Sequence, residues 1–226
     1  MFRPGPKIFA DSLGKKRKAM KRVLVFFGMI ATGKSYVARA YAERWQCPYF
    51  NSDIVRKELA GRFPESSVKT ALNEGIYSCV FTRKTYDELL HRAELALLRD
   101  GTKCVVLDAS YQSRPERDLV RDRLKNECKV FFIHCTCPEA VVRERLAQRA
   151  KDPHAVSEGR WEVYLEQKRN FDMPSELGDE FFLTLETDKN LPELLKLVEE
   201  KMHDTGECEE SVFLKPEKKN NKFGER

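Results

Sequence analysis

The segment that most constrains the fold is Gly28–Ser35, which reads GMIATGKS and matches the pattern G-x-x-x-x-G-K-S. An apolar run at residues 23–27 precedes it, and a helical pattern from about residue 34 to residue 45 follows it. Glycine lacks a Cβ atom, so the backbone can turn tightly here and aim successive N–H groups at one anion. The positive end of the helix dipole adds to this attraction. The pattern therefore predicts a loop that binds the phosphates of a nucleoside triphosphate.

Individual positions of this segment, called the phosphate loop below, have expected roles. The Lys34 ammonium reaches the β- and γ-phosphates, and the Ser35 hydroxyl ligates Mg²⁺. A glycine-rich turn with a surface lysine is the alternative interpretation, and the strand and helix on either side argue against it. We expect ATP and Mg²⁺ as cofactors. The predicted nucleotide-binding residues are Gly28, Met29, Ile30, Ala31, Thr32, Gly33, Lys34, Ser35 and Tyr36.

Composition limits the class of protein. The chain has 226 residues, of which 41% are hydrophobic and 34% charged, as expected of a globular chain with a single α/β domain. Its longest apolar run, residues 23–27, is far shorter than the roughly 20 residues that span a bilayer. The seven cysteines are an odd number, and most lie in apolar stretches, which is typical of reduced thiols. We expect a cytoplasmic protein without membrane contact.

The positive charge is concentrated near the N-terminus. Residues 1–22 carry eight basic residues and one acidic residue, while the other 204 residues carry 33 basic and 35 acidic ones. Residues 1–21 are predicted to be a flexible basic leader, residues 22–202 the folded domain, and residues 203–226 a flexible charged tail. A nucleic-acid-binding fold usually carries its basic excess on the folded part. Nucleic acid is therefore a less favoured partner than a small molecule, and the oligomeric state stays open.

Between these ends, apolar runs alternate with helical patterns, which predicts βαβ units and a parallel sheet. Strands are expected at residues 23–27, 48–50, 103–107, 130–135 and 181–185. Helices are expected over residues 34–45, from 51–53 to Gly61, from an N-cap at Thr82 to residues 100–101, over 114–126, from Pro138 through Arg149, over 158–171, and from Pro192 onwards.

Three charged residues follow two of these strands. In an open parallel sheet, ligands bind beyond the carboxyl ends of the strands. Asp108 ends one strand and could hold Mg²⁺ directly or through water, or it could simply cap a helix. Asp53 could accept the proton of an incoming hydroxyl, with an N-cap as its alternative role. Arg56, one helical turn later, could clamp an anionic or hydroxylated substrate or form a surface salt bridge.

The helix after Pro138 carries Arg143, Arg145 and Arg149. Phosphoryl transfer requires positive charge around the moving group. Arg145 and Arg149 share a helix face at i, i+4 and could point into the site from a lid, which makes them candidate catalytic residues. An exposed arginine-rich helix is the alternative.

Four segments carry a family resemblance: FFGMIATGKS, NSDIVRKELAG, VVLDASYQSRPER and CPEAVVRERLAQR. Together they resemble the small P-loop kinases, a predicted-kinase family related to gluconate kinases, zeta toxins and polynucleotide 5′-kinases. The resemblance covers about residues 22–202. It implies an α/β P-loop NTPase fold, a three-layer sandwich with a five-stranded parallel sheet in the order 2-3-1-4-5 and a helical lid. Thr32 departs from the Ser or Gly that many relatives carry before the second glycine of the loop.

The resemblance also implies roles for single residues. Lys34 would bind phosphate, Ser35 and Asp108 would serve the metal, and Asp53 would activate the substrate. Arg56 would contact the substrate, and Arg145 or Arg149 would be the lid arginine.

These observations predict an ATP-dependent kinase that transfers the γ-phosphoryl group to a hydroxyl of a small polar metabolite. One alternative is a polynucleotide 5′-hydroxyl kinase, suggested by the basic leader and the spacing of Asp53 and Arg56. Another is an ATP-dependent switch that is not a kinase; the sequence lacks the N-K-x-D segment of GTPase switches. The acceptor pocket is expected around residues 63–86 and the lid, but the acceptor and the preference for ATP over GTP are not decided.

Overall fold

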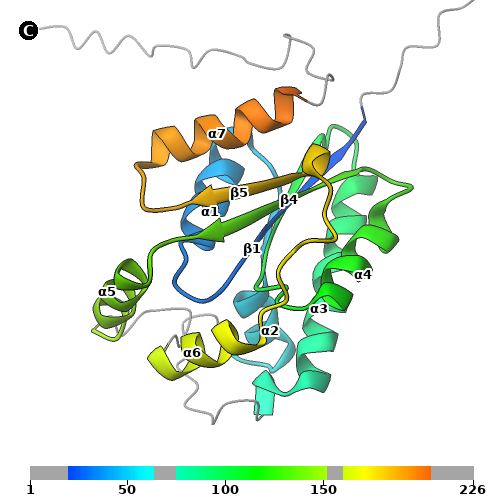
Figure 1. The fold of residues 1–226 in the computed structure, drawn as a ribbon. Helices are drawn as coiled ribbons and strands as arrows, with labels where there is room; N and C mark the ends of the chain where they lie inside the picture. Colours follow the sequence, from blue (N-terminus) through cyan, green and yellow to red (C-terminus); the bar gives the residue numbers. More distant parts are fainter. Residues whose placement is uncertain (1–19, 64–74, 152–159, 205–226) are drawn as a thin grey trace, which may run out of the picture.

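A computed structural model describes residues 20–63, 75–151 and 160–204 (Figure 1). Within them, five strands form one parallel sheet in the order β2-β3-β1-β4-β5. The predicted α/β fold and strand order are therefore confirmed. The strands are β1 (Arg22–Phe27), β2 (Tyr49–Asn51), β3 (Cys104–Asp108), β4 (Lys129–Thr136) and β5 (Phe182–Glu186).

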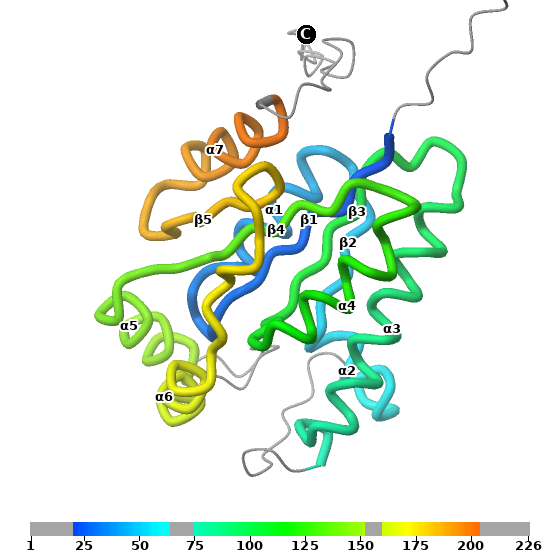
Figure 2. Tube along the Cα trace, turned by 45° about the vertical axis from the view of Figure 1, so that its right-hand side comes forward, coloured from blue at the N-terminus to red at the C-terminus, as the bar shows by residue number. Residues whose placement is uncertain are grey.

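Helices cover both faces of the sheet, which gives three layers (Figures 1 and 2). Helices α1 and α7 pack on one face, and α3 and α4 pack on the other, while α5 and α6 lie beyond the carboxyl ends of the strands. The helices are α1 (Lys34–Trp45), α2 (Ser52–Leu59), α3 (Cys79–Leu98), α4 (Arg114–Leu124), α5 (Glu139–Arg149), α6 (Trp161–Asn170) and α7 (Leu191–Asp204), with the short 3₁₀ turns η1 (Gly75–Tyr77) and η2 (Asp179–Phe181).

The central strand β1 explains why the first apolar run is continuous rather than alternating. Val23, Val25 and Phe27 belong to the core under α3 and α4, whereas Leu24 and Phe26 belong to the core under α1 and α7. All five side chains are fully buried. A strand covered on both faces needs apolar residues at every position. The loop that follows β1 is thereby anchored in the middle of the sheet.

The predicted N-cap of the third helix is wrong. We expected Thr82, but α3 begins at Cys79, and the Ser78 hydroxyl oxygen accepts a hydrogen bond from the backbone N–H of Phe81. Ser78 has the extended backbone that an N-cap needs, with φ −64° and ψ 155°. The Thr82 hydroxyl instead accepts a hydrogen bond from Arg56. The other expected strands and helices occur, with ends that differ from the prediction by up to three residues.

Several predictions fall outside the described residues. They are nearly all of the basic leader and the charged tail, part of the expected pocket segment at residues 63–86, and the expected start of the sixth helix at residue 158. Among the helices that the structure does describe, none combines the length and the apolar character needed to cross a membrane.

Candidate active site

The phosphate loop connects β1 to α1 in a conformation that requires its two glycines. Gly28 and Gly33 have φ values of 138° and 85°. A Cβ atom on Gly28 would lie 2.4 Å from the Cys135 carbonyl oxygen, and one on Gly33 would lie 2.8 Å from the Thr187 hydroxyl. Glycine is therefore needed at both positions for backbone conformation and for space.

The outer side of the phosphate loop is fixed by Thr187, which follows β5. Its hydroxyl donates a hydrogen bond to the Thr32 carbonyl oxygen at 2.5 Å. Arg145 donates in turn to the Thr187 hydroxyl at 3.1 Å, to the Thr187 carbonyl oxygen at 2.7 Å and to the Ala31 carbonyl oxygen at 3.3 Å. These contacts tie α5 and the end of β5 to the loop.

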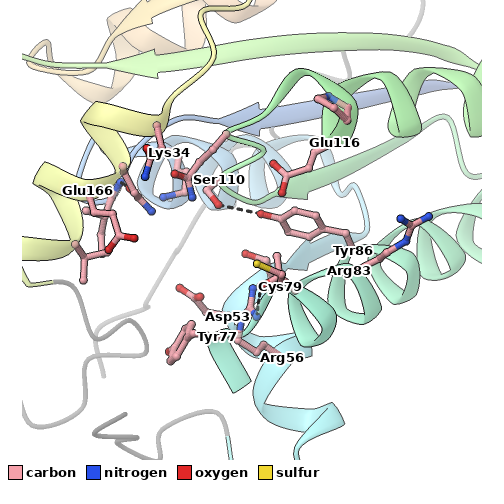
Figure 3. A pocket seen from close by; sticks show the side chains of 18 of the residues that line it. Lys34, Asp53, Arg56, Tyr77, Cys79, Arg83, Tyr86, Ser110, Glu116 and Glu166 are labelled. Atoms are coloured by element: carbon pink, nitrogen blue, oxygen red, sulfur yellow. Dashed lines mark hydrogen bonds between the residues drawn. The ribbon is translucent and has the colours of Figure 1, made fainter. Parts of the chain in front are cut away.

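A pocket of about 850 Å³ opens beside the inner side of the loop (Figure 3). Lys34 and Glu166 lie on one side of it in this view, and Asp53, Tyr77 and Arg56 lie on the other. The structure therefore brings three predicted site residues, Lys34, Asp53 and Arg56, into one pocket. The full lining is Ile30, Lys34, Ser52, Asp53, Arg56, Tyr77, Cys79, Thr82, Arg83, Tyr86, Ser110, Gln112, Pro115, Glu116, Leu119, Arg160, Val163, Glu166, Gln167 and Asn170.

Asp53 does not serve as the N-cap of α2. That role belongs to Asn51, whose side-chain oxygen accepts hydrogen bonds from the backbone N–H groups of Asp53 at 3.0 Å and Ile54 at 3.1 Å. The Asp53 carboxylate lies in the first turn of α2, where the helix dipole favours negative charge. Asp53 therefore contributes a carboxylate to the pocket wall that is not used for capping.

Arg56 is 6% exposed, so the predicted alternative of a surface salt bridge does not describe it. Its Nη1 donates hydrogen bonds to the Ile76 carbonyl oxygen at 2.6 Å and the Thr82 hydroxyl at 3.1 Å. The guanidinium lies 5.1 Å from the centre of the Tyr77 ring. Within the described residues, its Nε has no hydrogen-bond partner. A buried cation with a spare donor on a pocket wall is suited to bind a polar or anionic ligand.

Asp108 is fully buried at the end of β3 and does not line the pocket. Its Oδ2 accepts hydrogen bonds from the Tyr49 hydroxyl and the Asn51 amide, both at 2.6 Å. Burial and the charge of Asp108 raise the pKa of Tyr49, which therefore remains a hydrogen-bond donor. Oδ1 has no partner among the described residues.

The described residues contain no group of three or more His, Cys, Asp or Glu side chains that could hold a metal ion by themselves. Ser35, at the start of α1, and the unpaired Asp108 oxygen nevertheless fit Mg²⁺, which usually takes one or two protein ligands together with phosphate oxygens and water.

The arginines of α5 do not line the pocket. Arg145 contacts the phosphate loop from outside, as described above, and Arg149 is half-buried at the end of α5. Arg143 is exposed and lies 4.0 Å from the centre of the Trp161 ring. The predicted catalytic role of Arg145 and Arg149 stays a prediction.

The sequence did not predict that α6 and α4 form walls of the pocket. Gln167 of α6 accepts a hydrogen bond from the backbone N–H of Ile30 through its Oε1, at 2.6 Å. Glu116 of α4 forms a capping box with Ser113, and burial raises the pKa of its carboxyl group. The S-x-x-E spacing could have predicted the capping box. No comparable signal in the sequence marks Gln167.

Comparison with protein families gives one match. A family model described as an AAA domain matches residues 23–174, which includes the phosphate loop, Asp53, Arg56, Asp108 and α5. No curated protein matches the chain.

Comparison with solved structures gives many similar folds at low sequence identity. A gluconokinase from Sinorhizobium meliloti is 18% identical, with 84% of this chain and 99% of that chain covered and a TM-score of 0.53. An APS kinase from Mycobacterium tuberculosis, solved with AMPPNP and APS, is 19% identical, with 82% and 99% covered and a TM-score of 0.58. A shikimate kinase from Aquifex aeolicus is 12% identical, with 81% and 96% covered and a TM-score of 0.51. At these identities the likeness shows the fold, and the fold is that of the small P-loop kinases.

Proposed function

The chain belongs to this AAA domain family, and on that premise we propose that it is an ATP-dependent kinase that phosphorylates a hydroxyl group of a small polar metabolite. The observation that carries the proposal is the shared pocket of Lys34 and Asp53. Lys34 comes from the phosphate loop after β1, and Asp53 comes from the start of α2 after β2, yet both line one cavity. Transfer from a nucleotide to a second substrate requires such an arrangement.

The phosphate loop would bind the triphosphate. Its backbone amides and the start of α1 would hold the phosphates, and the Lys34 ammonium would neutralise charge on the β- and γ-phosphates. Ser35 and Asp108 would hold Mg²⁺, directly or through water. When bound, Mg²⁺ would supply positive charge that stabilises the phosphates during transfer.

Asp53 would act on the acceptor. Its carboxylate would orient the acceptor hydroxyl and take its proton as the oxygen attacks the γ-phosphorus. Arg56 would bind an anionic or hydrogen-bonding group elsewhere on the acceptor. The packing of Arg56 against Tyr77 and its bonds to Ile76 and Thr82 support this role, because they fix the guanidinium before the acceptor arrives.

Two further observations support the proposal: one concerns the size of the acceptor, and the other concerns the cellular compartment. The names of similar structures include gluconokinase and shikimate kinase, and the APS kinase was solved with APS. The six cysteines in the described part of the chain are free thiols, which is typical of the cytoplasm. We therefore propose a cytoplasmic location.

The test is an acceptor screen. ADP release from Mg²⁺-ATP would be measured with purified protein and a panel of sugar acids, polyols, nucleosides and a 5′-hydroxyl oligonucleotide. The proposal expects one small hydroxylated compound to accelerate ADP release at least about 100-fold. Acceleration only by the oligonucleotide would favour a polynucleotide kinase, and no acceleration by any acceptor would favour a nucleotide-dependent switch.

Variants then assign the roles. Lys34→Ala is expected to abolish nucleotide turnover. Asp53→Asn is expected to leave ATP affinity within about three-fold and to lower transfer at least about 100-fold. Asp122→Asn, which changes an exposed carboxylate on α4, is the matched control and should behave like the parent. Transfer retained by Asp53→Asn would contradict the role of Asp53 as the base.

A further inference from the structure

One amide of the phosphate loop already has an oxygen acceptor that comes from a distant helix. The backbone N–H of Ile30, the third residue of the loop, donates to Oε1 of Gln167 on α6 at 2.6 Å. The two residues are 137 positions apart in the sequence. Amides in loops of this kind bind the oxygens of anions. The Gln167 carbonyl oxygen therefore lies where a phosphate oxygen is expected.

Ile30 lies on the pocket side of the phosphate loop. Ile30 and Lys34 are the phosphate-loop residues that line the pocket, and Asp53 lines the same pocket. The phosphoryl group that is transferred must lie between the loop and Asp53. Of the three phosphates, the terminal one is therefore expected beside Ile30, while the other two are closer to the start of α1.

Helix α6 is held against the loop by more than this one bond. Tyr164 of α6 is buried in a cluster with Ala31 of the loop and with Val142 and Leu146 of α5. Gln167 follows Tyr164 by three residues, so the two side chains share one face of the helix. The contact between Gln167 and Ile30 thus lies beside a packed interface between α6 and the loop.

We propose that Gln167 substitutes for the terminal phosphate in the nucleotide-free protein and is displaced when a triphosphate binds. The inference rests on the proposed use of ATP. A diphosphate leaves the bond between Gln167 and Ile30 in place, whereas a triphosphate breaks it and loosens α6. Arg160, the N-cap residue of α6, and Glu166 within α6 also line the pocket, so this wall of the pocket moves when the terminal phosphate binds. Gln167 is in this sense a positioning residue.

The test compares Mg²⁺-AMPPNP with Mg²⁺-ADP by titration calorimetry in two variants. Gln167→Leu removes the competing hydrogen-bond acceptor. It is expected to raise the affinity for AMPPNP about five-fold, the effect expected from one hydrogen bond, and to leave the affinity for ADP nearly unchanged. Gln167→Glu keeps the size of the side chain but places a negative charge beside the terminal phosphate. It is therefore expected to weaken the binding of AMPPNP at least about five-fold more than the binding of ADP. Gln148→Leu, on the exposed part of α5, is the matched control.

A second readout follows α6 directly. Hydrogen exchange of the amides in residues 161–170 is expected to be faster with AMPPNP than with ADP in the parent, and equal with both in Gln167→Leu. If both variants change the two nucleotide affinities by the same factor, the inference is wrong and the proposed kinase function is unaffected. If the parent binds neither nucleotide, the proposed function and this inference are both overturned.

Discussion

The Asn51 side chain joins the carboxyl ends of β2 and β3 by donating a hydrogen bond to the Asp108 carboxylate at 2.6 Å. Its carbonyl oxygen accepts the hydrogen bonds that cap α2, and Asp53 lies in the first turn of that helix. One amide thus fixes the positions of both candidate acids relative to each other. Asn51 is 8% exposed, so water does not readily replace it.

Asn51→Ala is expected to lower the free energy of unfolding by about 2–4 kcal/mol, because it removes an N-cap and leaves a buried carboxylate with one partner fewer. Urea denaturation followed by circular dichroism measures this. The matched control is Asn190→Ala, which removes the exposed cap at the start of α7 and is expected to cost about 1 kcal/mol. Equal losses in the two variants would contradict a structural role for the bond to Asp108.

Gly28→Ala is expected to destabilise the protein by more than about 3 kcal/mol and to abolish nucleotide binding. The new Cβ would lie 2.4 Å from the Cys135 carbonyl oxygen, and the backbone of β4 cannot move without disturbing the sheet. Gly178→Ala is the control, because its Cβ would have no heavy atom of the described residues within 4 Å. Thermal unfolding with and without Mg²⁺-ADP tests both variants. A parent-like ADP shift in Gly28→Ala would contradict the expectation.

Arg145→Ala is expected to weaken nucleotide binding roughly ten-fold and to lower stability by about 1–3 kcal/mol, because it removes the hydrogen bonds that fix Ala31 and Thr187. Arg149→Ala, one turn further along α5, is expected to change stability by less than about 0.5 kcal/mol. Calorimetric titration with Mg²⁺-ADP and urea denaturation distinguish the two. A larger effect at Arg149 would favour a catalytic arginine at that position.

His134 is expected to make the protein less stable as the pH falls. It is 5% exposed and stacks against both Phe27 and Phe171, with ring centres 4.9 Å and 5.2 Å away. Burial, with a smaller effect of the Arg117 charge, lowers its pKa from 6.5 to about 4. Between about pH 6.5 and pH 4, His134 is therefore protonated in the unfolded chain but neutral in the folded chain. The free energy of unfolding falls as the pH drops through this range.

The loss from this one histidine is about 3 kcal/mol over that range. His134→Phe keeps an aromatic ring against Phe27 and Phe171 and removes the titrating group. Urea denaturation at a series of pH values is expected to give a flatter stability profile for the variant. Profiles of equal slope would mean that His134 is not the group responsible.

The sequence predicts the strands and the position of the phosphate loop because both depend on local pattern, whereas the strand order came from the resemblance to the small P-loop kinases. The apolar run of β1, the glycines of the loop and the helical spacing of α1 are all readable within about 25 residues. Asp53 and Asp108 were predicted as site residues because each follows a strand that can be recognised locally. Strand ends in a parallel sheet meet at one edge, where ligands bind.

The walls of the pocket were not predictable in this way. Gln167 reaches Ile30 only because Tyr164 packs against Ala31, a contact between distant segments that leaves no local pattern. In the sequence, Thr82 resembles an N-cap as closely as Ser78 does. In the structure, the Thr82 hydroxyl accepts a hydrogen bond from Arg56 instead, and Ser78 caps the helix. The Arg145 side chain likewise points to the phosphate loop because it is hydrogen-bonded to Thr187, which is distant in the sequence.

Of the 20 residues that line the pocket, α3 and α6 contribute four each, whereas the phosphate loop directly follows the buried central strand β1. Substitutions at the α3 positions are therefore expected to disturb the phosphate loop less than substitutions on α6, where Gln167 is bonded to Ile30. Under the proposed kinase function, a lineage built on this architecture can change its phosphoryl acceptor through α3 and keep the same nucleotide site.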